Sequence, residues 1–182
     1  MLHSYAMNKD EILDKAIRRV PDFPKPGILF FDVTSILTNP QAFKHTIDRM
    51  VEIYSNKNVD AIAAVESRGF LFGAPLAEKL GIPLVLIRKK GKLPGEIASS
   101  TYRTEYSESC LEAQRSAFRP DDRVLLVDDI IATGGSLLAA REVIRQCGAA
   151  CDHCLALGRI GGLNGEALLR EHGMNAVSLL EM

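Results

Sequence analysis

The sequence lacks the features that mark membrane, secreted or nucleic-acid-binding proteins. No apolar run approaches the roughly 18 residues that a membrane-spanning helix needs. The amino-terminal MLHSYAMNKDE has no basic segment followed by an apolar one, as a secretion signal would. The formal net charge is only -1, so bulk charge cannot hold nucleic acid and any anion site must be local. We therefore expect a cytoplasmic protein that binds neither nucleic acid nor membrane.

Cysteine is scarce, and the four cysteines are expected to be free thiols in the cytosol. Cys151 and Cys154, with His153 between them, have the spacing of half a metal site. No second pair of ligands accompanies them, whereas a structural zinc needs four. The segment also has the pattern of a strand, in which residues three apart point to opposite faces. We interpret both cysteines as packed strand residues.

The length of 182 residues fits a single domain, 1–182, in which strand-like and helical patterns alternate. The expected strands cover 28–33, 59–65, 83–88, 123–128, 154–158 and 176–180. The expected helices are one capped by Asn8 with an apolar face from Ile12 to Val20, then 40–54, 69–80, 135–147 and 164–172. Pro75 should kink the third helix or mark a later start. Prolines and a glycine make 21–27 a shaped loop.

The expected strands are continuous apolar runs rather than alternating ones, which indicates a parallel sheet buried on both faces. With right-handed crossovers this predicts a doubly wound α/β fold, a mainly parallel sheet flanked by helices. Ligands in such folds bind at the carboxyl ends of the strands. The residues that follow Val65, Arg88 and Asp128 are therefore the first candidates for a site.

One polar stretch, residues 89–109, does not fit this alternation. It is rich in glycine and serine and about 20 residues long, and loops of that length in compact domains are usually functional. We predict a mobile flap over about 90–109 with some extended structure.

Residues 124–136 combine an apolar strand, two carboxylates and a turn of small residues that opens a helix. Backbone N–H groups at a helix N-terminus favour an anion, and glycines let the backbone approach a phosphate. The carboxylates would repel a phosphate but can accept hydrogen bonds from sugar hydroxyls. By themselves they would fit a capping turn or a magnesium site equally well. The predicted ribose-phosphate site comprises Asp128, Asp129, Ala132, Thr133, Gly134, Gly135 and Ser136.

Residues 124–136 resemble the binding fingerprint for phosphoribosyl pyrophosphate (PRPP) of the type I phosphoribosyltransferases. Segments 21–37, 66–96 and 101–109 are similar to those of the adenine phosphoribosyltransferases within that family. The resemblance extends from about Val20 to the end of the chain. It implies the type I fold with a base-binding hood over about 8–37. It also implies transfer of the phosphoribosyl group from PRPP to N9 of adenine, which gives AMP and pyrophosphate.

The resemblance also implies roles for the loops at two strand ends. The loop after Val65 would bind pyrophosphate and would contain a non-proline cis peptide bond at Glu66–Ser67. A guanidinium and exposed N–H groups suit that role chemically. The basic cluster after the next strand would meet the same group. The predicted pyrophosphate contacts are Ser67, Arg68, Arg88, Lys89 and Lys92.

The hood and the flap would hold and activate the base. Glu105 would be catalytic, because a carboxylate facing the N7/N9 edge of the purine can relay the N9 proton. Tyr106 would help to close the flap, or it is a packing tyrosine. Backbone groups of Leu29 and Phe31 would read the base edge. The predicted adenine contacts are Phe23, Leu29, Phe30 and Phe31, at least two of which fit an apolar core equally well.

The resemblance further implies Mg²⁺ as cofactor, held mainly through PRPP with no firm protein ligand, and a homodimer. Two residues depart from the family pattern. Phe31 stands where a basic residue is frequent, and Arg159 stands where a glutamate is common. Both border the predicted base side. The alternatives are a transferase for another purine such as hypoxanthine, and a PRPP-sensing regulator without catalysis.

Overall fold

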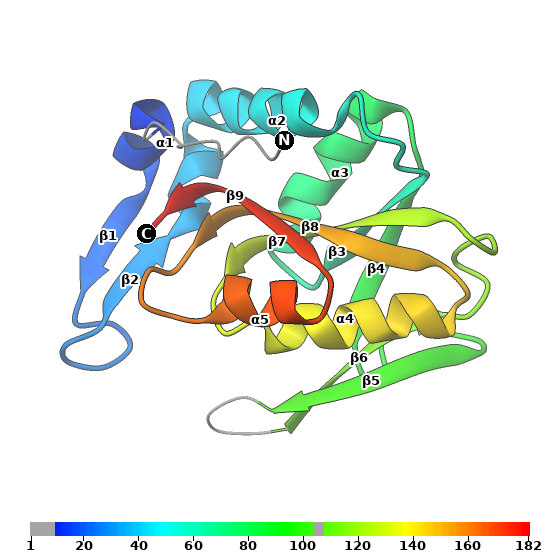
Figure 1. The fold of residues 1–182 in the computed structure, drawn as a ribbon. Helices are drawn as coiled ribbons and strands as arrows, with labels where there is room; N and C mark the ends of the chain where they lie inside the picture. The colour runs from blue at the N-terminus through cyan, green and yellow to red at the C-terminus, as the bar shows by residue number, and fades with distance from the viewer. Residues whose placement is uncertain (1–9, 104–107) are drawn as a thin grey trace.

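In a computed structural model of the chain, residues 10–103 and 108–182 are described. A seven-stranded sheet with the order β5-β6-β4-β3-β7-β8-β9 forms the centre, and β1 and β2 form a separate two-stranded sheet (Figure 1). The strands are β1 (Arg18–Pro21), β2 (Leu29–Asp32), β3 (Ala61–Val65), β4 (Leu84–Lys89), β5 (Ile97–Arg103), β6 (Glu108–Gln114), β7 (Arg123–Ile131), β8 (Ala150–Arg159) and β9 (Asn175–Glu181). The helices are α1 (Glu11–Ala16), the 3₁₀ helix η1 (Val33–Thr38), α2 (Pro40–Tyr54), α3 (Gly69–Leu80), α4 (Gly135–Gln146) and α5 (Gly165–Glu171).

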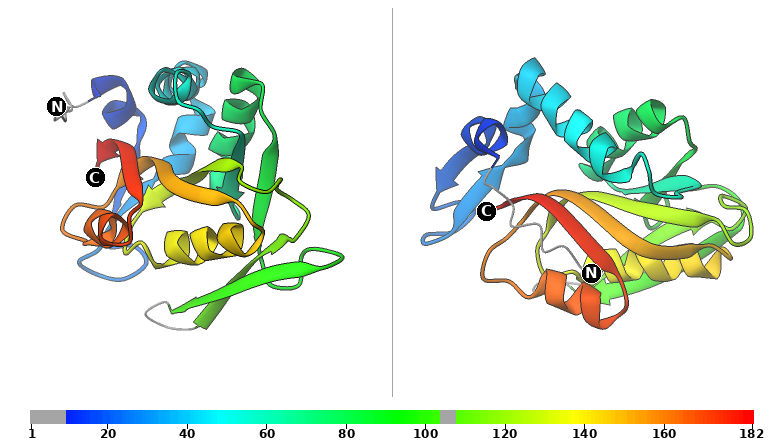
Figure 2. Two further views of the ribbon diagram at one scale, coloured as in Figure 1. Left: turned by 45° about the vertical axis from the view of Figure 1, so that its right-hand side comes forward. Right: turned by 45° about the horizontal axis from the view of Figure 1, so that its top comes forward.

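The predicted doubly wound sheet is confirmed. Strands β4, β3, β7, β8 and β9 are parallel, and helices cover both faces of the sheet (Figure 2). Helices α1, α2, α3 and η1 pack with one set of buried side chains, and α4 and α5 pack with the other. The carboxyl ends of β7, β8 and β9 point to the end of the molecule where the β1–β2 hairpin lies. None of the helices in the described ranges is both long and apolar enough to cross a bilayer.

The first helix is shorter than predicted. It ends at Ala16, and Val20 belongs to β1, which pairs with β2 in an antiparallel hairpin. The side chain of Asp10 caps this helix by accepting a hydrogen bond from the backbone N–H of Leu13. Pro21 keeps Val20 out of a helix, because a residue before proline is driven out of the helical region. Asn8, the predicted cap, lies outside the described residues.

Helix α3 begins at Gly69 and runs through Pro75 without interruption, so the predicted later start is wrong. The helix ends at Gly81, which has φ of 67° and thus the left-handed conformation that glycine adopts readily. Helix α2 begins as predicted, with the Asn39 side chain accepting a hydrogen bond from the N–H of Ala42.

The polar stretch after β4 contains two regular strands that the sequence did not reveal. Strands β5 and β6 pair with each other in antiparallel register, and β6 pairs with β4 only at Arg88 and Lys89. Seven consecutive register pairs join β5 to β6, so the predicted flap is a β-hairpin that extends the main sheet. The segment 104–107 between the two strands lies outside the described residues.

Strand β8 is longer than predicted and contains a bulge. Arg123 of β7 pairs with Ala150, whereas Leu125, two residues later, pairs with His153, so β8 carries one extra residue there. The bulge puts Cys151 and Cys154 in the same buried cluster on the α4 side, which corrects the prediction that they point to opposite faces. Both are fully packed free thiols, as the interpretation of packed strand residues requires.

Candidate active site

The turn from β7 into α4 leaves an open helix N-terminus. Gly134, with φ of 84°, precedes the first helical residue, and no side chain caps the helix or places a carboxylate in its first turn. The first intrahelical bond of this turn runs from the N–H of Leu138 to the carbonyl of Gly134. The preceding backbone N–H groups have no intrahelical acceptor, because the first turn of an α-helix offers none. This turn can therefore accept an anion such as a phosphate.

Two buried carboxyl groups lie immediately before that turn. Asp128 and Asp129 were predicted at the end of a strand, but β7 continues to Ile131 and both residues stand within it. Asp128 is in register with Ala156 of β8. Asp128 is 9% exposed and Asp129 4% exposed. The carboxylate of Asp128 accepts a hydrogen bond of 2.8 Å from the N–H of Asp129. The register of β7 with β8 thus fixes the position of both carboxyl groups along the strand, relative to the turn.

The electrostatics of this pair are unusual. Burial, and then the neighbouring charge of Asp129, raise the pKa of the Asp128 carboxyl well above its ordinary value. The Asp129 carboxylate has a counter-ion, because its Oδ2 lies 2.5 Å from Nε of Arg68. The site therefore joins one carboxyl group that is paired with a guanidinium to one that favours its neutral form. Either can accept a hydrogen bond from a hydroxyl group.

The loop between β3 and α3 approaches the carboxyl pair closely. The peptide bond between Glu66 and Ser67 is cis, at the position that the resemblance implied. A Cβ atom on Gly69 would lie 2.8 Å from the carbonyl oxygen of Val127, so only glycine fits where α3 begins. This packing brings Arg68 to Asp129 and leaves Ser67 exposed.

The predicted cations at the end of β4 are only partly free. The Glu66 carboxylate accepts hydrogen bonds from the N–H of Lys89 at 2.9 Å and from Nε of Arg88 at 3.3 Å. The Lys89 bond first, and then Arg88, hold the pKa of Glu66 below its ordinary value. The Arg88 guanidinium also donates to the carbonyl of Lys92 at 3.4 Å. The side chains of Lys89 and Lys92 are exposed, whereas the Arg88 guanidinium already has a partner.

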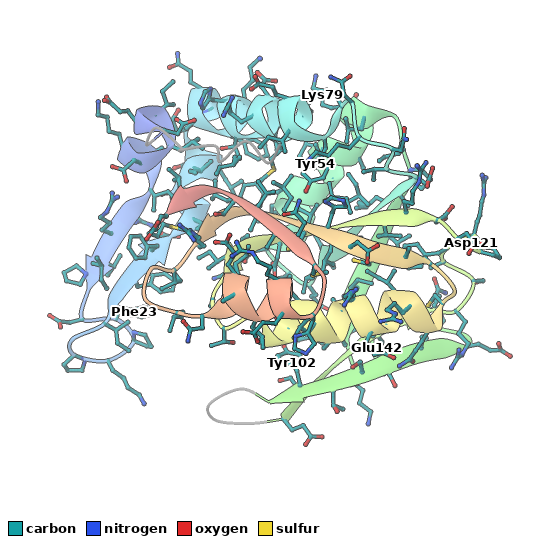
Figure 3. All side chains as sticks on the ribbon, in the orientation of Figure 1. Phe23, Tyr54, Lys79, Tyr102, Asp121 and Glu142 are labelled. Atoms are coloured by element: carbon teal, nitrogen blue, oxygen red, sulfur yellow. The ribbon has the colours of Figure 1, made fainter. Side chains whose placement is uncertain are left out.

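The β1–β2 hairpin carries the predicted base contacts, which divide into two groups. Phe23, labelled in the hairpin loop of Figure 3, is 50% exposed and meets Phe30 edge to face with ring centroids 5.0 Å apart. Leu29 is 49% exposed. The Phe31 ring instead packs against the core on the α1–α3 side, and the Arg19 guanidinium lies 5.8 Å from its centroid. Phe31 thus has a core side chain, and only its backbone is available for the predicted contact.

Glu105 and Tyr106, predicted as the catalytic carboxylate and the flap tyrosine, lie outside the described residues. Strands β5 and β6 lead into and out of their segment.

In residues 10–103 and 108–182 no group of three or more histidine, cysteine, aspartate or glutamate side chains could hold a metal ion.

The structure adds one position that the sequence did not suggest. A Cβ atom on Gly165, the first residue of α5, would lie 2.1 Å from the carbonyl oxygen of Ala132 and 3.0 Å from the N–H nitrogen of Gly134. The backbone at the start of α5 therefore packs directly against the backbone of the β7–α4 turn. In the sequence, Gly165 is simply a glycine near a helix start, and nothing there distinguishes it.

Comparison with known proteins agrees with this geometry. The family described as "Phosphoribosyl transferase domain" matches residues 32–160. The adenine phosphoribosyltransferase of Treponema denticola is 57% identical over 141 residues, which are 78% of this chain and 74% of that protein. The adenine phosphoribosyltransferase of Shewanella loihica is 44% identical over 177 residues, covering 96% of this chain and 98% of that protein.

Solved structures give the same result. The adenine phosphoribosyltransferase of Thermoanaerobacter pseudethanolicus has a TM-score of 0.87 at 39% identity, covering 93% of this chain and 98% of that one. The Saccharomyces cerevisiae enzyme, solved with adenine and an iminoaltritol bisphosphate, has a TM-score of 0.85 at 40% identity, covering 92% and 96%. The chain therefore belongs to the phosphoribosyltransferase family and, within it, to the adenine phosphoribosyltransferases.

Proposed function

We propose that this protein transfers the 5-phosphoribosyl group of PRPP to N9 of adenine, giving AMP and pyrophosphate. The names of its relatives support this reaction. The observation that carries the proposal is the open N-terminus of α4 directly after two buried carboxyl groups. A ribose 5-phosphate needs both parts, because its phosphate seeks N–H donors and its hydroxyls seek acceptors.

In this proposal the β7–α4 turn holds the ribose phosphate. Backbone N–H groups from Ala132 to Ser136 and the hydroxyls of Thr133 and Ser136 donate to the 5-phosphate. Asp128 and Asp129 accept hydrogen bonds from the ribose hydroxyls. Burial of the carboxyl groups fixes their orientation before the substrate arrives, which lowers the entropy that binding must overcome.

Pyrophosphate binding would involve Ser67, Arg68, Arg88, Lys89 and Lys92. When ribose hydroxyls take over the Asp129 carboxylate, the Arg68 guanidinium becomes available to the pyrophosphate, which has the opposite charge. Lys89 and Lys92 are exposed and can move to the same anion. Together these cations would stabilise the negative charge that develops on the leaving pyrophosphate as the C1′–O bond breaks.

The base would lie between the β1–β2 hairpin and the ends of the parallel strands. The exposed ring of Phe23 and the partly buried ring of Phe30 offer apolar contacts, and the backbones of Leu29 and Phe31 offer hydrogen bonds to the base edge. Glu105 would take the N9 proton as N9 attacks C1′. Tyr106 and the rest of the flap would keep water from the activated sugar.

Glu105→Gln tests the catalytic role. Without a proton acceptor, kcat should fall about 100-fold while KM for PRPP changes little, because acid–base groups contribute in that range to chemistry and not to binding. Steady-state kinetics with the matched variant Glu108→Gln, an exposed residue at the start of β6, provides the control. An unchanged kcat for the Glu105 variant would remove this residue from the mechanism.

Mg²⁺ is proposed as the cofactor. This ion binds through one or two carboxylates together with substrate phosphates and water, and Asp128 with Asp129 is a donor set of that size. When bound, it would neutralise charge on the pyrophosphate.

A cytoplasmic homodimer is also proposed. Leu71 of α3 and Leu86 of β4 are large apolar side chains exposed on contacting elements, a kind of surface that dimers bury. Sedimentation of the protein at micromolar concentration tests the dimer, and a monomer would contradict it.

The experiment that tests the reaction mixes the protein with PRPP, Mg²⁺ and one base at a time: adenine, hypoxanthine, guanine, xanthine or orotate. We expect nucleotide from adenine alone. Product from hypoxanthine instead would retain the PRPP site and change the base. No product from any base, with PRPP still bound, would leave a PRPP sensor.

A further inference from the structure

A single arginine joins three elements beside the β7–α4 turn. Arg159 ends β8, and its two terminal nitrogens contact Glu166 in the first turn of α5 and, at 2.6 Å, Glu181 at the end of β9. The other carboxylate oxygen of Glu166 receives Arg170 of the same helix at 2.9 Å. The side chains of Arg159, Glu166 and Glu181 border a small cavity of about 60 Å³.

The helix that Arg159 holds is the one that supports the phosphate turn. Gly165, the neighbour of Glu166, contacts the backbone of Ala132 and Gly134 so closely that no side chain fits between them. The N–H of Ile160, next to Arg159, donates to the carbonyl of Ile131 at 3.0 Å. A shift of the first turn of α5 would therefore shift the N–H groups of residues 132–134 by a similar distance.

The ion pairs of Arg159 should contribute little to the stability of the fold. The side chains of Arg159, Glu166 and Glu181 are 40%, 25% and 61% exposed, and ion pairs at such exposure stabilise a fold little. Phosphate binding is more sensitive to position, since hydrogen bonds from N–H groups weaken steeply as their distance and angle depart from the favourable range. The pairs with Glu166 and Glu181 come from different elements, so they resist motion of α5 relative to the sheet.

We propose that Arg159 is a positioning residue: its ion pairs with Glu166 and Glu181 fix α5 against residues 132–134 and so place the N–H groups that bind the 5-phosphate. This role rests on the proposed function only in naming the phosphate of a ribose 5-phosphate as the ligand. Both terminal nitrogens of Arg159 are engaged by carboxylates, so the residue acts through α5 and not on the substrate.

The test compares Arg159→Gln with Arg170→Gln. Both variants remove one arginine from the same Glu166 carboxylate, but the Arg170 pair lies within α5 and cannot restrain the helix against the sheet. Arg159→Gln should raise KM for PRPP roughly tenfold and leave kcat and KM for adenine within about twofold, because only the phosphate contact moves. Calorimetry should show the same loss in affinity for ribose 5-phosphate. Arg170→Gln should match the wild type in every value.

A charge swap gives the rescue. Arg159→Glu alone should bind ribose 5-phosphate weakly, and Arg159→Glu with Glu166→Arg should regain part of the affinity, because it restores opposite charges between β8 and α5 while the pair with Glu181 stays lost. An Arg159→Gln variant with a lower Tm but unchanged KM for PRPP and unchanged ribose 5-phosphate affinity would overturn the proposal, as would equal losses in both glutamine variants. A wild type that binds ribose 5-phosphate but forms no AMP would sink the proposed reaction and leave the positioning test intact. A wild type that binds no ribose 5-phosphate would overturn both.

Discussion

At the level of single residues, Asp128 has a cost in stability that its proposed role explains. Burial raises the pKa of its carboxyl, so between the unfolded pKa near 4 and the higher folded pKa the native state holds more protons than the unfolded state. The free energy of unfolding therefore falls as pH rises through that window and stays reduced above it. A polar pair retained at such a cost is typical of functional sites.

Asp128→Asn should make the protein more stable at pH 8, by about 1 kcal/mol, while lowering activity, because it removes a buried ionisable group but keeps an oxygen for the N–H of Asp129. The gain should shrink toward pH 4.5, where the Asp128 carboxyl of the native wild type is largely protonated and, like asparagine, uncharged. Urea unfolding at the two pH values measures this. A variant less stable than the wild type at pH 8 would contradict the pKa argument.

Gly165→Ala should weaken ribose 5-phosphate binding by at least about tenfold, because the new methyl group would collide with the Ala132 carbonyl and displace the phosphate turn. Gly158→Ala is the matched control. Its Cβ would meet only side-chain atoms of Met182, a flexible side chain that can turn away. Calorimetry on both variants tests this, and equal affinities would show that α5 does not support the turn.

At the level of elements, agreement between sequence and structure follows burial. Strands β3, β4, β7 and β9 are close to their expected ranges because each contains an uninterrupted apolar run, which in β3 and β7 is buried on both faces. Strands β1, β5 and β6 were missed because they are hairpin strands with many polar residues, whose pairing depends on a partner elsewhere in the chain. The bulge in β8 depends on its register with β7, which no pattern within β8 reveals.

That bulge has a chemical consequence for the thiols. Burial raises the pKa of Cys151 to about 12 and that of Cys154 well above its ordinary value, so neither should form a reactive thiolate in the native protein. Cys110 and Cys147 are only partly covered. At pH 8 iodoacetamide should label Cys110 in native protein, Cys147 more slowly because burial raises its pKa as well, and Cys151 and Cys154 only in urea. Peptide mass spectrometry measures this, and rapid native labelling of Cys151 would contradict the packing.

The candidate site was predictable in its residues and less so in its contacts. The strand, carboxylates and small-residue turn of 124–136 lie together in sequence, so their chemistry could be predicted from it. The ion pair of Arg68 with Asp129 and the support of the turn by Gly165 join segments far apart in the chain. Phe31 was expected near the base, yet its ring packs into the core because the β1–β2 register turns it inward.

At the level of the whole molecule, the proposed function depends on one spatial arrangement. The carboxyl ends of the parallel strands, the open end of α4 and the β1–β2 hairpin lie at the same end of the protein (Figure 2). A near-neutral chain of this kind binds an anion through local N–H groups and paired cations and not through its overall field. The arrangement thus predicts both where a nucleotide lies and which way it points.

A crystal structure with AMP bound tests that arrangement most directly. We expect the 5′-phosphate within hydrogen-bonding distance of the N–H groups of residues 132–136, the ribose hydroxyls at Asp128 and Asp129, and the adenine ring toward the β1–β2 hairpin. A phosphate bound away from the N-terminus of α4, or an adenine ring on the other side of the sheet, would contradict it.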